Sequence, residues 1–292
     1  MVRHTGAVMA VVVVCVLLVL AGIVAVIRWG GLAVQPPPAL AGDAAVRPPV
    51  GQVVRHNLWN ATVALTVGVA AGIVAAGAGG RLVMRLLAVT AGRDAQGRIT
   101  EADEIVGRIT ADGTIGFFIF IGVAFGLVTA VAFLLVRCWL PGGRTGGLVF
   151  GALLLIVAGT RVDPLRANNP DFSLVGPEWV AVAALLALGL FHGMVIAALA
   201  GRYSRALPPI SPAPRAIAAY TPLLLLLFPL FLLIPVFLAG GLVAIIGSRI
   251  RPLLALWHDH RVVIAGRIAL TVAGLAALPG FVSALARILH LA

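Results

Sequence analysis

The sequence predicts an all-α integral membrane protein, a bundle of about seven transmembrane helices in which the sixth is long and kinked by prolines. The composition is the first reason. Of 292 residues, 61% are hydrophobic and 11% are charged, whereas a soluble globular chain has roughly 45–50% and about 25%. The mean hydropathy of +1.12 is the second reason. These values exclude a soluble enzyme and a disordered tail, and two cysteines exclude a disulfide-stapled domain.

The third reason is the set of uncharged runs, which divide the chain into spans. Span one, 5–27, is longer than the apolar core of a signal peptide, about 7–15 residues, so we expect a retained anchor. A linker rich in Pro and Ala follows. Spans two and three cover 57–80 and 113–136. Span five covers 179–201 and span seven covers 262–286.

Spans four and six are unusual in length. Span four, 146–160, has 15 residues and reaches ~22 Å against a ~30 Å hydrocarbon core. It therefore needs flanking residues, or the Arg161 side chain must extend to the interface. Span six, 216–248, has 33 residues and contains three prolines, which predicts one kinked and tilted helix.

Aromatic residues support this division, because Trp and Tyr gather at membrane interfaces. Seven of them lie at or near the ends of the expected spans: Trp29, Trp59, Trp139, Trp179, Tyr203, Tyr220 and Trp257. The chain then divides into an N-terminal anchor and linker, 1–57, a four-helix core, 58–202, and C-terminal helices, 203–292. The core carries two polar loops, 81–112 and 161–178.

Charge suggests an orientation. The net charge is +11, and the basic residues, all arginine, lie at the ends of apolar runs without a DNA-binding motif, so we expect the lipid bilayer and not nucleic acid as their partner. The short loops 137–145 and 202–215 contain arginine and no acid. The positive-inside rule places these loops in the cytoplasm. Seven spans of the cell membrane then put the N-terminus outside and the C-terminus in the cytoplasm.

Part of the chain carries a pattern of short motifs: Gly80-Arg-Leu-Val-Met-Arg85, Thr100-Glu-Ala-Asp103, Gly113-Thr-Ile-Gly116, Asp163-Pro164 and Asn169-Pro-Asp-Phe172. Through them the stretch 80–202 resembles an uncharacterised family of bacterial multi-span integral membrane proteins without an assigned activity. The resemblance implies a membrane architecture and supplies no functional residue.

The loop 161–178 is the first candidate ligand-binding site. It holds Asp163, Arg166, Asn169 and Asp171 on the same expected side as the loop 81–112. Together the two loops form a polar cap that either holds a ligand or is a solvated surface with Asx-turns and ion pairs.

Two other segments carry metal-like residue patterns. The segment 94–103 is similar to the second half of a calcium loop but lacks the first carboxylate, so a helix cap that begins at Thr100 is favoured. The run His258-Asp259-His260 is favoured as an interfacial turn. We therefore predict no metal site and no cofactor.

His192 is the second candidate, because it is the one ionisable side chain well inside a clear span. It is either a ligand-binding residue or a neutral histidine that hydrogen-bonds a neighbouring helix. Arg81 and Arg85 share a helix face where span two leaves the membrane, and we expect them to bind lipid headgroups. Four G-x-x-x-G pairs begin at Gly68, Gly122, Gly147 and Gly189 and predict close helix packing.

Three classes of function remain. No P-loop, H-E-x-x-H or G-x-S-x-G motif is present, and no expected span contains Asp or Glu. A non-enzymatic membrane protein, a structural or assembly subunit with membrane-protein partners or copies of itself, is therefore favoured. A permease or channel-like transporter of a small solute is the first alternative. A membrane enzyme that acts on a lipid-linked substrate through its loop acids is the second.

Overall fold

The structure, a computed structural model, describes residues 2–35, 50–101, 104–108, 110–161, 165–208, 214–221 and 259–290. Most of the described residues lie in helices, and the described loops contain one isolated β-bridge, between Ile99 and Ile105. Five helices are long and apolar enough to cross a membrane, and a sixth apolar helix is shorter.

Among the described residues two helices are interrupted by π-helical segments (η) and a third ends in one. In chain order the elements are α1 (Val2–Trp29), α2 (Val50–Ala71), η1 (Gly72–Gly79), α3 (Gly80–Thr90), α4 (Ala111–Gly116), η2 (Phe117–Val123), α5 (Ala124–Val136), α6 (Gly143–Leu154), η3 (Leu155–Gly159), α7 (Asp171–Leu174), α8 (Glu178–Ala206), α9 (Pro214–Ala219) and α13 (His260–Ile288).

The expected spans agree in part with these elements. Apolar helices cover spans one, two, three, five and seven. Span four is the short helix Gly143–Gly159, which begins three residues before the expected start. The span 216–248 lies mostly outside the described residues, so the count of seven and the proline-kinked helix are not confirmed.

The second helix is longer than its apolar run. The sequence ends span two at residue 80, before Arg81 and Arg85, but helical structure continues through α3 to Thr90. The apolar face of α3 explains the continuation, because Leu87 and Ala88 are buried against neighbouring elements.

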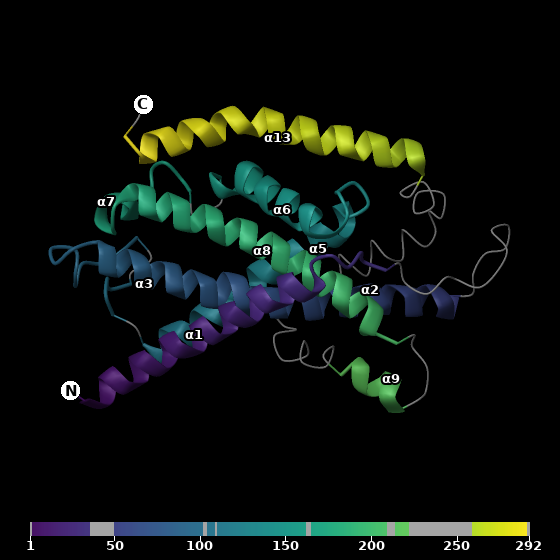
Figure 1. Cartoon of the computed structure of the whole chain (residues 1–292), viewed down its shortest axis with the longest axis horizontal. Helices are drawn as coiled ribbons and strands as arrows, with labels where there is room; N and C mark the ends of the chain where they lie inside the picture. The colour runs from purple at the N-terminus through teal and green to yellow at the C-terminus, as the bar shows by residue number, and fades with distance from the viewer. Residues whose placement is uncertain are drawn as a thin grey trace.

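All the long helices run between two ends of the bundle (Figure 1). At one end, which we call the basic end, Arg144 donates to the carbonyl oxygen of Ile27, and the amide of Gln35 donates to Ser204 Oγ at 3.0 Å. These contacts bring together the end of α1, the start of α6 and the end of α8.

The opposite end, which we call the acidic end, contains the loops 91–110 and 160–177. There His290 Nε2 lies 3.7 Å from Glu178 Oε1, so the last turn of α13 lies beside the first turn of α8. The N-terminus of α1 points to the same end (Figure 1). The seven-span prediction requires opposite sides of the membrane for the two termini, whereas α1 begins and α13 ends at the same end of the bundle; the placement of the termini relative to a membrane stays a prediction. The direction of α13 depends on how many crossings precede it, and no residue within α13 carries that information.

The core is built on two crossings where glycines bring helix backbones into contact. In the first, Gly68 and Gly72 lie against Gly122 and Gly126. A Cβ atom added at Gly126 would overlap the carbonyl oxygen of Gly68, and one added at Gly72 would overlap that of Gly122. The crossing therefore depends on the missing side chains.

The second crossing joins α6 to α8 through the other two G-x-x-x-G pairs. A Cβ atom at Gly151 would lie 2.7 Å from the carbonyl oxygen of Gly189, and one at Gly193 would overlap that of Gly147. The four motifs thus pair two by two. Around the crossings lies an apolar core in which Val67, Ala75, Ala130 and Val195 are fully buried.

The π-helical segments lie at or near these contacts. Segment η1 packs against η2, and Gly122 of η2 meets the backbone of both Gly72 and Gly77. A π-helix closes its hydrogen bonds between residues five apart instead of four, which widens the turn. Segment η1 consists of Gly, Ala, Ile and Val. Its small residues allow the backbone of η2 to approach closely at these wider turns.

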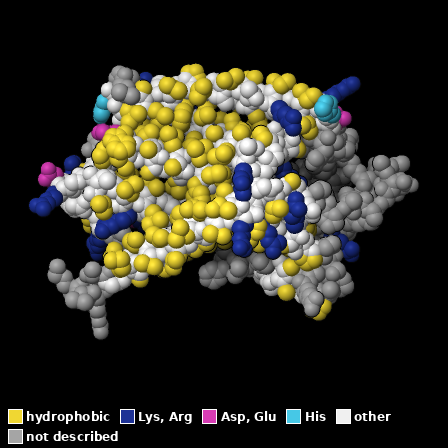
Figure 2. All heavy atoms as spheres, in the orientation of Figure 1, with side chains coloured by type: hydrophobic (Ala, Val, Ile, Leu, Met, Phe, Trp, Pro, Cys, Tyr) yellow, Lys and Arg dark blue, Asp and Glu magenta, His cyan; other side chains and the backbone are white. Residues whose placement is uncertain are grey.

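The outer surface matches a bilayer environment. Exposed apolar side chains follow one stripe of α13: Ile264, Ile268, Val272, Leu275, Leu278 and Val282. Figure 2 shows apolar side chains across the middle of the face in view, with arginines toward both ends and acidic side chains at the left edge and at the upper right.

The first crossing can be tested with one methyl group. We expect Gly126→Ala to destabilise the protein by about 1–3 kcal/mol, because its Cβ has no space against Gly68. Gly116→Ala is the matched control, since its Cβ meets nothing within 4 Å; alanine there should be neutral or stabilise by up to about 1 kcal/mol. Thermal unfolding of the detergent-solubilised protein measures both. Equal stability of the two variants would contradict the packing described.

Candidate functional site

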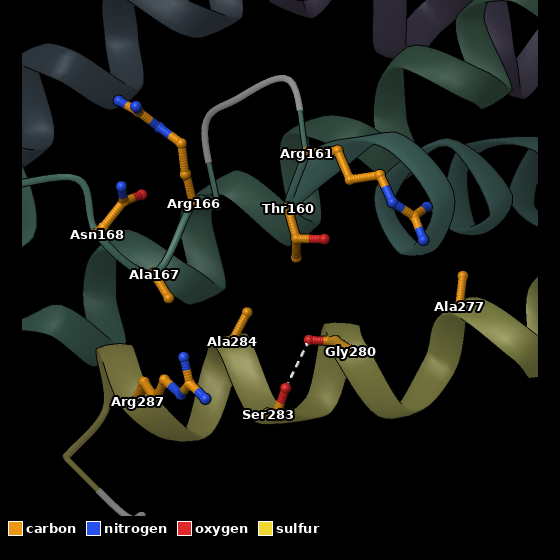
Figure 3. Close-up of a pocket in the computed structure, with 10 residues that line it drawn as sticks. All are labelled: Thr160, Arg161, Arg166, Ala167, Asn168, Ala277, Gly280, Ser283, Ala284 and Arg287. Carbon is orange, nitrogen blue, oxygen red and sulfur yellow. Dashed lines mark hydrogen bonds between the residues drawn. The ribbon is translucent and has the colours of Figure 1, made fainter.

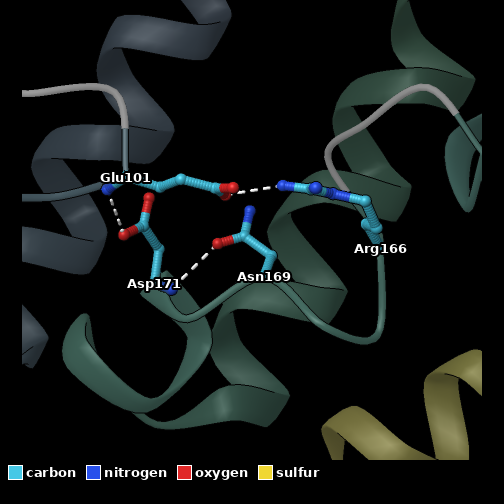
Figure 4. Close-up of polar contacts among 4 residues, drawn as sticks. All are labelled: Glu101, Arg166, Asn169 and Asp171. Carbon is cyan, nitrogen blue, oxygen red and sulfur yellow. Dashed lines mark hydrogen bonds and ion pairs between the residues drawn. The ribbon is translucent and has the colours of Figure 1, made fainter.

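The two polar loops meet at the acidic end (Figure 4). Arg166 Nη2 lies 2.6 Å from Glu101 Oε2 in a salt bridge. The backbone amide of Glu101 donates to Asp171 Oδ1 at 2.9 Å. One residue of the first loop is therefore held by two residues of the second.

Local sequence explains why the second loop presents these groups. The amide of Asp171 donates to Asn169 Oδ1 at 2.8 Å, an Asx-turn that precedes α7. Asp171 then lies in the first turn of α7, where a carboxylate is favoured by the helix dipole. Leu165 and Phe172 are buried beneath the loop and anchor it to α8 and to the end of α13.

The four polar residues bind one another. Arg166, Asn169 and Asp171, which the sequence suggested as ligand-binding residues, lie together here, and Glu101 is the partner that sequence reasoning did not single out. Asp163 lies outside the described residues. The side chains of Arg166 and Glu101 are 33% and 43% exposed, and a salt bridge at such exposure contributes roughly 0–1 kcal/mol. The arrangement fits a link between loops.

The first loop folds back on itself. Ile99 pairs with Ile105, the amide of Thr100 donates to the carbonyl oxygen of Glu104 at 2.9 Å, and the amide of Glu104 donates to Thr100 Oγ1 at 3.2 Å. The helix expected to begin at Thr100 includes residues 102 and 103, which lie outside the described residues; the described residues 104–108 are not helical. Gly97 and Gly107, with φ of +83° and +85°, reverse the chain on either side of this turn.

Metal-ligating residues do not cluster in the part of the chain that the structure describes: no group of three or more His, Cys, Asp or Glu side chains could hold an ion there. Asp259, from the expected interfacial turn, caps α13 by accepting from the amide of Arg261 at 2.8 Å. His258 lies outside the described residues.

Arg81 points inward, toward the start of α4. Its guanidinium carbon lies 4.7 Å from the centre of the Phe117 ring, and Nη2 donates to the carbonyl oxygen of Gly113. Thr110 caps the same turn by accepting from the amide of Gly113 at 3.1 Å. These contacts stabilise the start of α4, while headgroup binding by Arg81 and Arg85 stays a prediction.

His192 is buried at the contact of α8 with α5. Its side chain is 2% exposed, and Nε2 lies 2.8 Å from Thr129 Oγ1. The Phe125 ring lies at 5.0 Å, centre to centre. The neighbouring Gly193 forms part of the second crossing, so the glycine contacts fix the position of the imidazole.

The hydrogen-bond partners select the tautomer of His192. Thr129 Oγ1 lies 2.7 Å from the carbonyl oxygen of Phe125 and donates its one hydrogen there. The hydroxyl can then only accept from the imidazole, so Nε2 carries the proton. Nδ1 is left as a buried acceptor without a hydrogen-bond partner. Leaving a buried acceptor without a partner costs less free energy than leaving a buried N–H donor without one.

A cavity of about 470 Å³ lies at the acidic end, between the end of η3 and the last turns of α13 (Figure 3). Arginine and small residues line it: Thr160, Arg161, Arg166, Ala167, Asn168, Ala277, Gly280, Ser283, Ala284 and Arg287. Sequence reasoning missed this site because it placed Arg287 at the opposite end from Arg161.

Comparison of the chain with known proteins identifies no relative: no protein-family model, curated protein or solved structure matches it.

The histidine contact can be tested by removing one partner and then both. We expect Thr129→Val to cost about 0.6–1.7 kcal/mol, because the N–H of His192 loses its acceptor in an apolar interior. The double variant Thr129→Val/His192→Phe should recover part of that loss, since neither polar group remains. Thr271→Val is the control: Thr271 is exposed on α13 and bonds only its own helix at Arg267. Thermal unfolding gives the three values, and a double variant less stable than Thr129→Val would contradict the pairing.

Proposed function

We propose that this chain is a non-enzymatic protein of the cell membrane that acts as a structural or assembly subunit. One observation carries the proposal. The two crossings place helix backbones in direct contact at Gly68–Gly126 and at Gly147–Gly193. Helices that touch in this way form a fixed core and leave no room between them for a solute at these depths.

The alternative of a membrane enzyme requires loop carboxylates that are available to a substrate. Glu101 is bound to Arg166, and Asp171 accepts from the amide of Glu101. Acid–base chemistry favours a carboxylate whose pKa is raised by burial or by a like charge close by. Instead these two carboxylates link the loops, which favours the structural function.

The alternative of a permease draws on one observation, the buried Nδ1 of His192. That imidazole lies between α5 and α8, one residue from Gly193, with the Phe125 ring against it. Transport past this point would require the contact between α5 and α8 to open. The packing therefore supports the permease less than the structural subunit.

A subunit of an assembly needs a face for its partner within the bilayer. Helices α1 and α13 are the least buried of the five long helices: 17% and 11% of the residues in their most apolar 18-residue stretches are buried. Both carry exposed apolar side chains along much of their length. We propose that one of these faces contacts another membrane protein or a second copy of this chain, and that lipid covers the rest.

Photo-cross-linking in membranes of the native host tests this proposal. A benzophenone amino acid replaces Leu17 on α1, Leu275 on α13 or Val128 on α5, which are three exposed positions. We expect a protein adduct of one discrete mass from Leu17 or Leu275. The same probe at Asp94, in the exposed loop, is the control and should give no such adduct.

The possible results separate the functions. A discrete adduct, whether with another protein or of twice the chain's mass, supports an assembly subunit. Lipid adducts alone from all three positions would overturn it.

We also propose that the basic end faces the cytoplasm. The short connection 137–142 and the end of α8 carry Arg137, Arg202 and Arg205 without acidic neighbours, as the positive-inside rule favours. Because α1 begins and α13 ends at the acidic end, this orientation places both termini outside. The C-terminus therefore differs from its sequence-based placement.

Single cysteines in a Cys15→Ala/Cys138→Ser background test the orientation. Asp94→Cys reports on the acidic end and Thr145→Cys on the basic end, and both positions are exposed. A membrane-impermeant maleimide should label the first in intact cells and the second only in inside-out vesicles. The reverse pattern would place the acidic end in the cytoplasm.

A further inference from the structure

The cavity at the acidic end has the composition of an anion site. Arg161, Arg166 and Arg287 line it together with the polar side chains of Thr160, Asn168 and Ser283. No carboxylate lines it among the described residues, although this end of the bundle carries most of the acids. Guanidinium groups favour phosphate because their planar set of N–H donors matches its oxygens.

Arg161 and Arg287 are exposed at the ends of apolar helices, which is the depth of the headgroup region. Arg161 follows the end of η3, and Arg287 lies in the last turn of α13. Arg161 donates to the carbonyl oxygen of Val157 at 2.6 Å, one turn back along its own helix. In Figure 3 the Arg161 side chain points toward the side of Ala277 and away from Arg287. Arginines at the ends of spanning helices reach headgroups by extending their long side chains, so Arg161 would exchange its bond to Val157 for the ligand.

The side of the cavity formed by α13 is made of small residues. Ala277, Gly280 and Ala284 follow one another at helical spacing and line it beside the lipid-facing stripe of α13. Figure 3 shows these residues across an open gap from Thr160 and Arg161. A groove that is polar at its outer end and made of Ala and Gly below suits a headgroup with an attached chain.

We propose that this cavity binds the phosphate group of an anionic phospholipid, with Arg161 and Arg287 as the principal contacts. Arg166 serves mainly the link to Glu101 and borders the site. The phosphate lies between the end of η3 and the last turns of α13, and an acyl chain follows Ala277 and Gly280. The lipid thereby joins α13 to the core at the acidic end.

Native mass spectrometry of the full chain in detergent tests this with dioleoyl-phosphatidylglycerol as the probe and dioleoyl-phosphatidylcholine as the comparison. Each arginine–phosphate contact should account for about tenfold in affinity. The double variant Arg161→Gln/Arg287→Gln should therefore lose most binding of phosphatidylglycerol. Arg267→Gln is the matched control, because Arg267 is exposed on the same helix near its other end.

A second variant tests the groove without a change of charge. A Cβ atom at Gly280 meets nothing within 4 Å, so Gly280→Leu can fold and would fill the gap. It should also weaken binding of phosphatidylglycerol. Gly116→Leu, whose Cβ is equally free of contacts, is the control.

The outcomes are distinct. Weaker binding of phosphatidylglycerol by both cavity variants, with no competition by millimolar inorganic phosphate, supports a lipid headgroup. Competition by inorganic phosphate, lost in the double arginine variant, supports the same anion site with free phosphate as its ligand. Equal binding of phosphatidylglycerol by the wild type and the double arginine variant overturns the proposal.

Discussion

Backbone contact at the two glycine crossings is the constraint on which the rest of the structure depends. Lipid tails are as apolar as leucine, so helices in a bilayer gain little from burying apolar surface against one another. Close approach, with the dispersion contacts that it allows, supplies the association instead. Gly68 with Gly126 and Gly147 with Gly193 remove the side chains that would hold the helices apart. The positions of α2, α5, α6 and α8 follow from these contacts.

The crossings also position the chemistry. Because Gly193 touches α6, the adjacent His192 is held with Nε2 against Thr129 of α5. At the acidic end the same helices place the loops 91–110 and 160–177 side by side, where Arg166 reaches Glu101. Helix α13 lies outside this core. It packs along η3, and the contact leaves the arginine-lined cavity between them.

The apolar runs predict the helices well, because hydropathy alone decides whether a segment can cross a bilayer. They predict helix ends less well where a charge is satisfied by a neighbour, as Arg81 is by Gly113 and Phe117. The glycine pairs were visible in the sequence, but spacing does not state which pair meets which. The meeting of Arg166, Asn169 and Asp171 with the first loop followed from their shared side. That Arg161 and Arg287 line one cavity could not be predicted, because it depends on the direction of α13.

The π-helical segment η1 sets the rotation of everything that follows it in its helix. In an α-helix each residue turns the chain by about 100°, whereas the wider turns of η1 distribute its eight residues differently around the axis. The side chains of α3 therefore point in directions other than those that an uninterrupted α-helix from α2 would set. Conversion of η1 to regular α-helix would move Arg81 around the helix and away from Phe117. The inward direction of that arginine is thus encoded upstream, by the small residues of η1.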